Sequence, residues 1–191
     1  MKNKIISTFG DAYLKHIENI DYPQIHIVDL TERTKSAQGI EIYNEQPEGI
    51  DSLLIENPNL NITATFFKPQ CFLHESGYEP DNCEGVFYMS DSTNETWVLF
   101  LEIKDCKAKN ISNYFVKAKK QIINVVRIFR AKKIITENKR VYANISFPKS
   151  NKNVFFSHLI EPGEAKSFLD NYNIFIRGTN KLKIKSSTKI C

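Results

Sequence analysis

Thr96-Trp97-Val98-Leu99-Phe100-Leu101-Glu102-Ile103-Lys104 is an apolar run of strand-forming residues that ends in an acid and a lysine. Because successive side chains of a strand point to opposite faces, Glu102 and Lys104 share one face and Ile103 turns away. Packing rarely explains a carboxylate and an ammonium at the end of a buried strand. The pair suits chemistry better, because a carboxylate can hold a hard divalent cation and a lysine can steady a water or a developing phosphate charge.

The segment before this run supplies a second acid. Gly85 to Ser90 is predicted to be a strand and Asp91 to Glu95 a turn, so the two strands should form an antiparallel hairpin. If the hairpin folds about Ser92 and Thr93, paired residue numbers add up to roughly 185 or 186, and Glu84 lies opposite Leu101 or Glu102. Two facing carboxylates repel each other unless a cation separates them. Asp81 is the alternative first acid, but the register favours Glu84.

A long helix is predicted after Lys104, beginning at Asn110 or Ser112 and ending near Lys133. Its apolar residues recur at helical spacing and should form one buried stripe: Ile111, Phe115, Ala118, Ile122, Val125, Val126 and Phe129. Basic residues cover much of the remaining surface. Gln121 lies at the edge of the stripe, where it is either a boundary residue or part of a functional site.

These residues resemble the PD-(D/E)xK nuclease superfamily, which has the restriction-endonuclease-like fold. In its pattern an acid precedes one strand, an acid-x-lysine tripeptide ends the next antiparallel strand, and a helix follows. Glu84 (or Asp81) matches the first acid, and Glu102-Ile103-Lys104 matches the tripeptide. Gln121 falls where many members carry a glutamine on the helix. The resemblance covers roughly residues 70–135, and Asp11 or Glu18 could supply the N-terminal helix acid that some members have.

The resemblance implies a metal-dependent nuclease that hydrolyses DNA phosphodiester bonds. Glu84 (or Asp81) and Glu102 would bind Mg²⁺ or Mn²⁺ together with the backbone carbonyl of Ile103, and Lys104 would orient the attacking water or neutralise the phosphate. Gln121 and the basic helix face would hold the DNA, through Lys117, Lys120, Arg127 and Arg130. The alternative is a catalytically inactive nuclease-like fold that binds nucleic acid or a protein partner, which the Glu in place of the usual first Asp favours. Nucleases of this type often pair, so a homodimer is also considered.

Charge is unevenly distributed along the 191 residues, although the net charge is only +4. Residues 1–103 hold 6 Lys and Arg against 17 Asp and Glu, whereas residues 104–191 hold 20 against 5. This asymmetry indicates a polyanion partner for the basic half, with a phosphate backbone as the obvious candidate. The alternative is that the two halves attract each other and present an ordinary solvated surface.

The remaining elements complete an α/β pattern. A helix is predicted over residues 10–20, a loop over 45–61 and a second helix over 163–171, and strands are predicted over 24–28, 40–43, 62–67, 141–147 and 173–177. Residues 181–185 alternate Lys with apolar residues and should form an edge strand or a frayed tail. This order predicts a mixed central β-sheet flanked by helices, in a single domain over 1–191 with its nuclease core at about 60–150.

Cysteine usage and hydropathy bear on the environment of the protein. No apolar run approaches the ~18 residues of a transmembrane helix, and no secretory signal is apparent, so we expect no membrane association. Four irregularly spaced cysteines suggest reduced thiols and a cytoplasmic location. Cys71, His74, Cys83 and Cys106 could together bind structural zinc, but we interpret the cysteines as buried or half-buried thiols.

Overall fold

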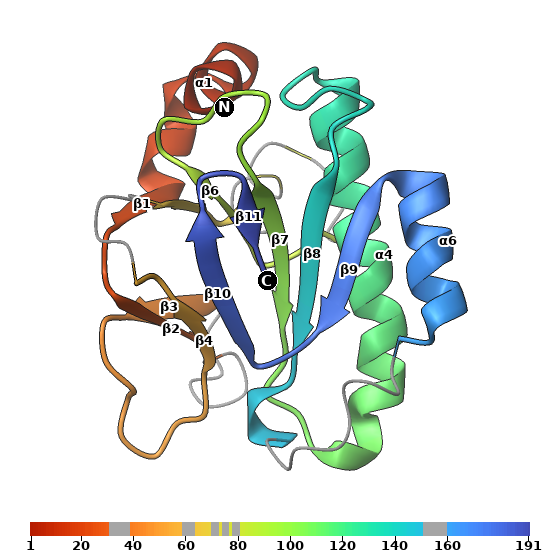
Figure 1. Cartoon of the computed structure of the whole chain (residues 1–191). Coiled ribbons are helices and arrows are strands. Elements are labelled where there is room, and N and C mark those ends of the chain that lie inside the picture. The colour runs from red at the N-terminus through yellow and green to blue at the C-terminus, as the bar shows by residue number, and fades with distance from the viewer. Residues whose placement is uncertain (31–38, 59–63, 70–72, 74–76, 78–80, 151–159) are drawn as a thin grey trace.

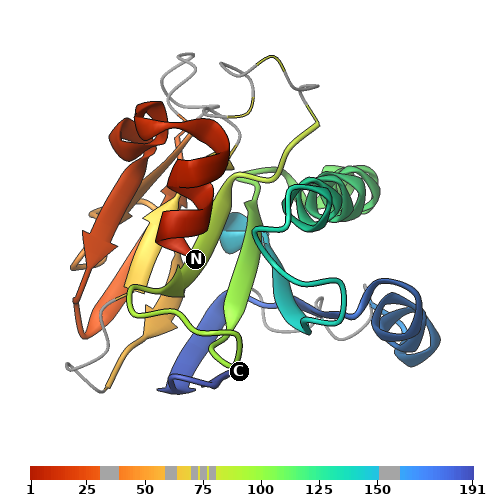
Figure 2. The ribbon, with the colours of Figure 1, turned by 90° about the horizontal axis from the view of Figure 1, so that it is seen from above.

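The chain forms a three-layer α/β structure in a computed structural model that describes residues 1–30, 39–58, 64–69, 73, 77, 81–150 and 160–191. Two mixed β-sheets pack face to face, and helices cover the outer face of the larger sheet (Figures 1 and 2). The predicted class, a mixed central sheet flanked by helices, is therefore confirmed. The sequence did not predict that the strands divide between two sheets.

The larger sheet contains six strands in the order β1-β5-β6-β7-β8-β9. Their bounds are Ile17–Ile20 (β1), Ala64–Phe67 (β5), Gly85–Met89 (β6), Val98–Ile103 (β7), Val141–Ser146 (β8) and Ile174–Gly178 (β9). β6 and β7 form the predicted hairpin, with Gly85 opposite Leu101 and Val86 opposite Phe100. β8 and β9 continue the sheet parallel to β7. The registered pairs add up to 186, so one further step along the ladder places Glu84 opposite Glu102.

The smaller sheet contains five strands in the order β11-β10-β4-β2-β3. Their bounds are Gln24–Asp29 (β2), Ile40–Tyr43 (β3), Leu53–Glu56 (β4), Lys181–Ser186 (β10) and Lys189–Ile190 (β11). β4 lies in the segment predicted to be a loop, because Leu53 and Ile55 bury their side chains against the larger sheet. The prediction of an edge strand or a tail for residues 181–185 was also wrong, since β10 pairs with both β4 and β11 and buries Leu182 and Ile184.

The helices pack on the outer face of the larger sheet. α4 (Ile111–Ala131) buries the whole predicted apolar stripe, and α6 (Pro162–Tyr172) lies beside it with Pro162 in its first turn. The short helices η2 (Ala108–Asn110) and η3 (Pro148–Ser150) lie in connections. Among the residues described, no helix is long and apolar enough to span a membrane.

The N-terminal segment differs from its prediction. Instead of one helix over residues 10–20, α1 (Lys2–Phe9) is followed by the 3-10 helix η1 (Asp11–His16) and then by strand β1. The break falls at Gly10, whose φ of 79° is a conformation that glycine adopts easily. Ile17 and Ile20, predicted to face a helix stripe, instead pair with Phe67 and Ala64 of β5. An extended pairing partner therefore overrides a weak helical periodicity.

Candidate functional site

The larger sheet brings Glu84, Glu102 and Lys104 together at the carboxyl end of β7. Glu102 is the fifth residue of β7 and is fully buried, whereas Glu84 immediately precedes β6 and is 3% exposed. Lys104 follows β7, and its backbone N–H donates to the Ser146 carbonyl of β8 at 3.0 Å. This bond continues the parallel β7–β8 pairing and turns the lysine side chain toward the two acids. The predicted convergence of three charged side chains is present.

The contacts within the cluster are direct. The Lys104 ammonium forms an ion pair with Glu84 Oε1 and lies 3.0 Å from Glu102 Oε1. The backbone N–H groups of Glu84 and Ile103 donate to Glu102 Oε2 and Glu84 Oε2, at 3.1 and 3.3 Å. The Glu102 carboxylate is thus held by the backbone of Glu84, and the Glu84 carboxylate by the backbone of the residue that follows Glu102. Within the described part of the chain, Glu102 Oε1 accepts no hydrogen bond, so its stabilisation comes from the charge of Lys104.

Burial governs the electrostatics of the two acids. Loss of solvent raises the pKa of Glu102 to about 7, although Lys104 opposes this shift. The pKa of Glu84 is raised well above its usual value by burial first and by the charge of Glu102 second. Burial by itself would lower the pKa of Lys104, but Glu84 and Glu102 outweigh it and raise that pKa. The cluster is therefore stabilised by added positive charge, whether from protons or from a cation.

Asp29 is a third acid that sequence reasoning missed. It ends β2 in the smaller sheet, is 4% exposed, and its Oδ2 accepts a hydrogen bond from the Asp105 N–H at 3.1 Å. Its charge contributes to raising the pKa of both Glu84 and Glu102. The available signal was an acid at the end of an alternating strand, and the predicted strand over 24–28 stopped one residue short of it. Asp11 and Glu18, the predicted helix acids, lie elsewhere: Asp11 is exposed and Glu18 pairs with Lys68 at 3.0 Å.

Asp81, the alternative first acid, lies outside the cluster. Its side chain is 63% exposed, and its nearest described cation is Lys117, 3.9 Å away. The segment that carries Asp81 is held by α4, because Asn124 Nδ2 donates to the Asp81 carbonyl at 2.9 Å. Between the two predicted first acids, Glu84 is the one placed beside Glu102 and Lys104.

Gln121 contacts the backbone rather than the acids. Its side chain is 3% exposed, and Nε2 donates to the Asn82 carbonyl at 2.9 Å, two residues before Glu84. Gln121 Oε1 is buried and accepts no hydrogen bond from the residues that the structure describes. The glutamine therefore fixes the approach to β6, and through it the position of Glu84.

The four basic residues predicted to bind nucleic acid divide between the two ends of α4. Lys117 and Lys120 are exposed on the turns nearest Asp81 and Asn82. Arg127 lies over the ring of Tyr172, 5.6 Å from its centroid, and partly buried Arg130 donates to the Lys139 carbonyl at 3.3 Å. Thirteen residues of helix separate Lys117 from Arg130, about 20 Å. The four side chains therefore do not form one compact patch.

The donor chemistry of the cluster suits a hard cation. Carboxylate oxygens are the ligands that Mg²⁺ and Mn²⁺ prefer, and Mg²⁺ commonly uses only one or two of them together with waters. Glu102 Oε1 has no hydrogen bond in the described structure and is paired only with the charge of Lys104, so a cation could take over that role. No group of three or more His, Cys, Asp or Glu side chains suited to holding a metal occurs among the described residues. The fit is thus to a cation with two protein carboxylates.

The structure describes two of the cysteines that were considered as zinc ligands. Cys83 and Cys106 are free thiols, 0% and 2% exposed, and pack in the apolar layer beneath the helices. This agrees with the interpretation as buried thiols for these two residues. Cys71 and His74, the other proposed zinc ligands, lie outside the described residues.

No protein-family model matches the chain, and no curated protein matches it. Among solved structures it is similar to SfsA of Pyrococcus furiosus in complex with Ca²⁺, at 12% identity over 88% of this chain and 91% of that chain, with a TM-score of 0.23. A likeness at that TM-score carries no argument about family, ligand or activity. The class that the structure defines is an α/β protein with a buried acid–lysine cluster at the carboxyl end of an inner strand.

Proposed function

We propose that the protein is a metal-dependent nuclease that hydrolyses DNA phosphodiester bonds. One observation carries this proposal: two buried carboxylates share one lysine ammonium at the carboxyl end of β7. Such an arrangement costs stability as a structural device, because burying charges loses more solvation than the pair regains. Its presence is explained if the acids bind a cation and the lysine acts on a substrate.

In this proposal Glu84 and Glu102 hold Mg²⁺ or Mn²⁺. When bound, the metal lowers the pKa of a water and offsets the charge that develops on the phosphate. Lys104, freed from part of its ion pairing, donates hydrogen bonds to the attacking water or to a phosphate oxygen. Gln121 positions Glu84 by holding the Asn82 carbonyl. Lys117 and Lys120 are exposed on the turns of α4 that contact this segment and would contact the DNA backbone without reading its sequence.

A cleavage assay tests the proposal. Supercoiled plasmid is incubated with Mg²⁺ or Mn²⁺ and the wild type, Glu102→Ala or Lys104→Ala, all purified in parallel. We expect each substitution to lower the rate by about 10²-fold or more, because each removes an interaction with the developing charge. Asp170→Asn and Lys166→Ala are the matched controls, since both residues are exposed on α6. Equal rates for the wild type and the Glu102 and Lys104 variants would refute the proposal.

The second candidate is a nuclease-like module that binds nucleic acid or a protein partner without cleaving. It is favoured by the absence, among described residues, of a ready group of three or more metal-binding side chains, and by Lys104 lying against both acids. Titration with Mn²⁺ separates the two candidates. A nuclease should bind Mn²⁺ and lose that binding in Glu84→Ala, whereas a binding module should show no saturable Mn²⁺ binding in either protein.

A further inference from the structure

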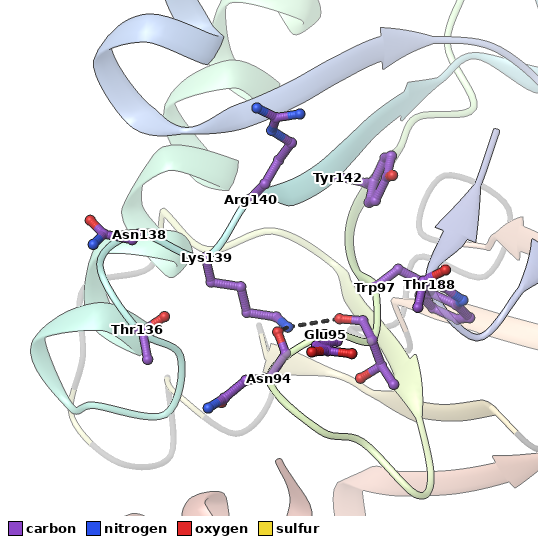
Figure 3. Close-up of a pocket in the computed structure, with 10 residues that line it drawn as sticks. Asn94, Glu95, Trp97, Thr136, Asn138, Lys139, Arg140, Tyr142 and Thr188 are labelled. Atoms are coloured by element: carbon purple, nitrogen blue, oxygen red, sulfur yellow. Dashed lines mark hydrogen bonds between the residues drawn. The ribbon is translucent and has the colours of Figure 1, made fainter.

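A polar cavity lies at the opposite end of β7 and β8 from the acid–lysine cluster. Its volume is about 380 Å³, within the size range of small-ligand pockets. Its walls come from residues before β7, residues before β8 and the turn between β10 and β11 (Figure 3). The lining side chains include Lys139, Arg140, Thr136, Asn138, Tyr142 and Thr188. Hydrogen-bond donors and cations therefore dominate this cavity.

Lys139 brings a charge to the cavity that no acid neutralises. Its Nζ donates to the carbonyls of Asn94 and Thr96, at 2.7 Å each, which leaves the third ammonium hydrogen without a protein acceptor among the described residues. The side chain is half-buried, and burial together with the charge of Lys4 lowers its pKa. No carboxylate of the described chain forms an ion pair with it. A half-buried cation beside another cation is stabilised by an anion.

Arg140 adds a second cation to the lining, and in Figure 3 its side chain points away from the Lys139 ammonium, to the side on which Tyr142 lies. Its side chain is exposed and forms no hydrogen bond or ion pair within the residues described, so its guanidinium is available to a ligand. Glu95 is the single acid of the lining, and it pairs with neither Lys139 nor Arg140 in the described structure. Guanidinium groups bind phosphate oxygens in a bidentate manner, which suits an anionic ligand at the mouth of the cavity.

Aromatic side chains form another wall. Tyr142 and Trp97 both line the cavity, and in Figure 3 the ring of Tyr142 lies across the cavity from Lys139. The Tyr142 ring is partly exposed and stands edge-on to Phe175, which is 38% exposed on the neighbouring strand β9. Arg177 lies over Phe175, 4.9 Å from the ring centroid. Aromatic rings beside cations are typical of surfaces on which nucleic-acid bases stack.

We propose that this cavity is a second binding site, which takes a nucleotide unit by its phosphate and its base. Arg140 binds the phosphate, the ring of Tyr142 contacts the base, and Lys139 adds positive charge from the other side of the cavity. The unit belongs either to a free nucleotide or to a single-stranded nucleic acid, because both offer the same phosphate and base. The site is separate from the acid–lysine cluster, so it does not depend on metal binding or on nuclease activity.

Binding measurements in EDTA test the site without involving the metal. AMP, inorganic phosphate and a short single-stranded oligonucleotide are each titrated into the full chain, with Trp97 fluorescence or calorimetry as the signal. Trp97 is the single tryptophan of the chain and lines the cavity. Arg140→Glu should weaken AMP and oligonucleotide binding at least 10-fold. Lys166→Glu makes the same charge change on exposed α6 and should leave binding within twofold of the wild type.

A separate variant tests the contact between the Tyr142 ring and the base. Tyr142→Leu should weaken AMP severalfold more than inorganic phosphate, because it removes only the surface for the base. If the oligonucleotide binds more tightly than AMP and AMP displaces it, the ligand of the site is single-stranded nucleic acid. If AMP binds more tightly than the oligonucleotide, the ligand is a free nucleotide. Three results would overturn the proposal. The first is that neither AMP nor the oligonucleotide binds saturably, and the second is that Arg140→Glu and Lys166→Glu weaken binding equally. The third is that inorganic phosphate binds as tightly as AMP.

Discussion

Lys104 separates two acids that would otherwise face each other. It contacts both Glu84 and Glu102 while its side chain remains 20% exposed, so it lies between the two buried carboxylates and solvent. Because the two acids have raised pKa values, the importance of the lysine depends on how many protons they carry. Its side chain should matter most where both acids are ionised.

Lys104→Met should therefore destabilise the protein in a pH-dependent manner. We expect a loss of about 3 kcal/mol in the free energy of unfolding at pH 8, because the variant leaves buried carboxylates without their cation. At pH 5 Glu102, whose pKa is raised to about 7, holds its proton, so the loss should be smaller. Urea denaturation at both pH values measures this difference. A pH-independent loss would contradict the charge-based account, and Lys166→Met controls for removal of a surface lysine.

Glu102 makes a separate contribution to pH dependence in metal-free protein. Its folded-state pKa of about 7 lies above the ordinary glutamate value of 4.5, so between these pH values the unfolded chain releases a proton that the folded protein retains. Stability should fall as pH rises through this window and then level off. Glu102→Gln lacks this titration, so its stability relative to wild type should rise by about 3 kcal/mol between pH 4.5 and 7.5. Denaturation of both proteins in EDTA measures this, and a flat difference would contradict the shift.

At the scale of elements, α4 does more than cover the sheet. Its apolar stripe packs against β7 and β8, and its polar edge holds the segment before β6 through Gln121 and Asn124. The helix thereby links the position of Glu84 to the packing of the outer layer. A polar residue at the edge of a buried stripe has a structural role here that its sequence position alone did not specify.

Gln121→Ala should loosen this link. The free energy of unfolding should fall by about 1 to 2 kcal/mol, because the buried Asn82 carbonyl loses its donor. Amide hydrogen exchange at Glu84 should accelerate relative to the wild type, since the segment before β6 is less constrained. Lys120→Ala, an exposed neighbour on the same helix, should change stability by less than about 0.5 kcal/mol. Unchanged exchange at Glu84 would show that Gln121 does not position it.

At the scale of the whole molecule, the two sheets share one apolar layer. Leu99, Leu101 and Ile103 of β7 pack with Leu182 and Ile184 of β10, and the Trp97 Nε1 donates to the Ser186 carbonyl at 3.0 Å. Ion pairs also connect the acidic and basic halves of the chain, such as Lys181 with Glu56. Part of the charge asymmetry is thus used within the fold, while Lys120, Arg140 and Lys166 remain unpaired in the described structure.

This shared layer predicts a single cooperative unfolding transition. Trp97 fluorescence reports the contact between the sheets, and far-ultraviolet circular dichroism reports the secondary structure of the whole chain. Midpoints in urea should coincide, because neither sheet retains its core without the other. Separated midpoints would show two independently folding units and would contradict the prediction of a single domain over 1–191.

Local sequence determined the elements in which pattern and packing agree. The β6–β7 hairpin, its register and the buried stripe of α4 follow from alternation and helical spacing, since these patterns need only the nearest layer to form. The convergence of Glu84, Glu102 and Lys104 follows from that register. Only the tertiary structure decided the division into two sheets and the inner position of β10. It also decided the position of Asp29 near Glu84 and the cavity beside Lys139. Each depends on segments far apart in the chain, whose pairing is set by the packing of the whole core rather than by any local pattern.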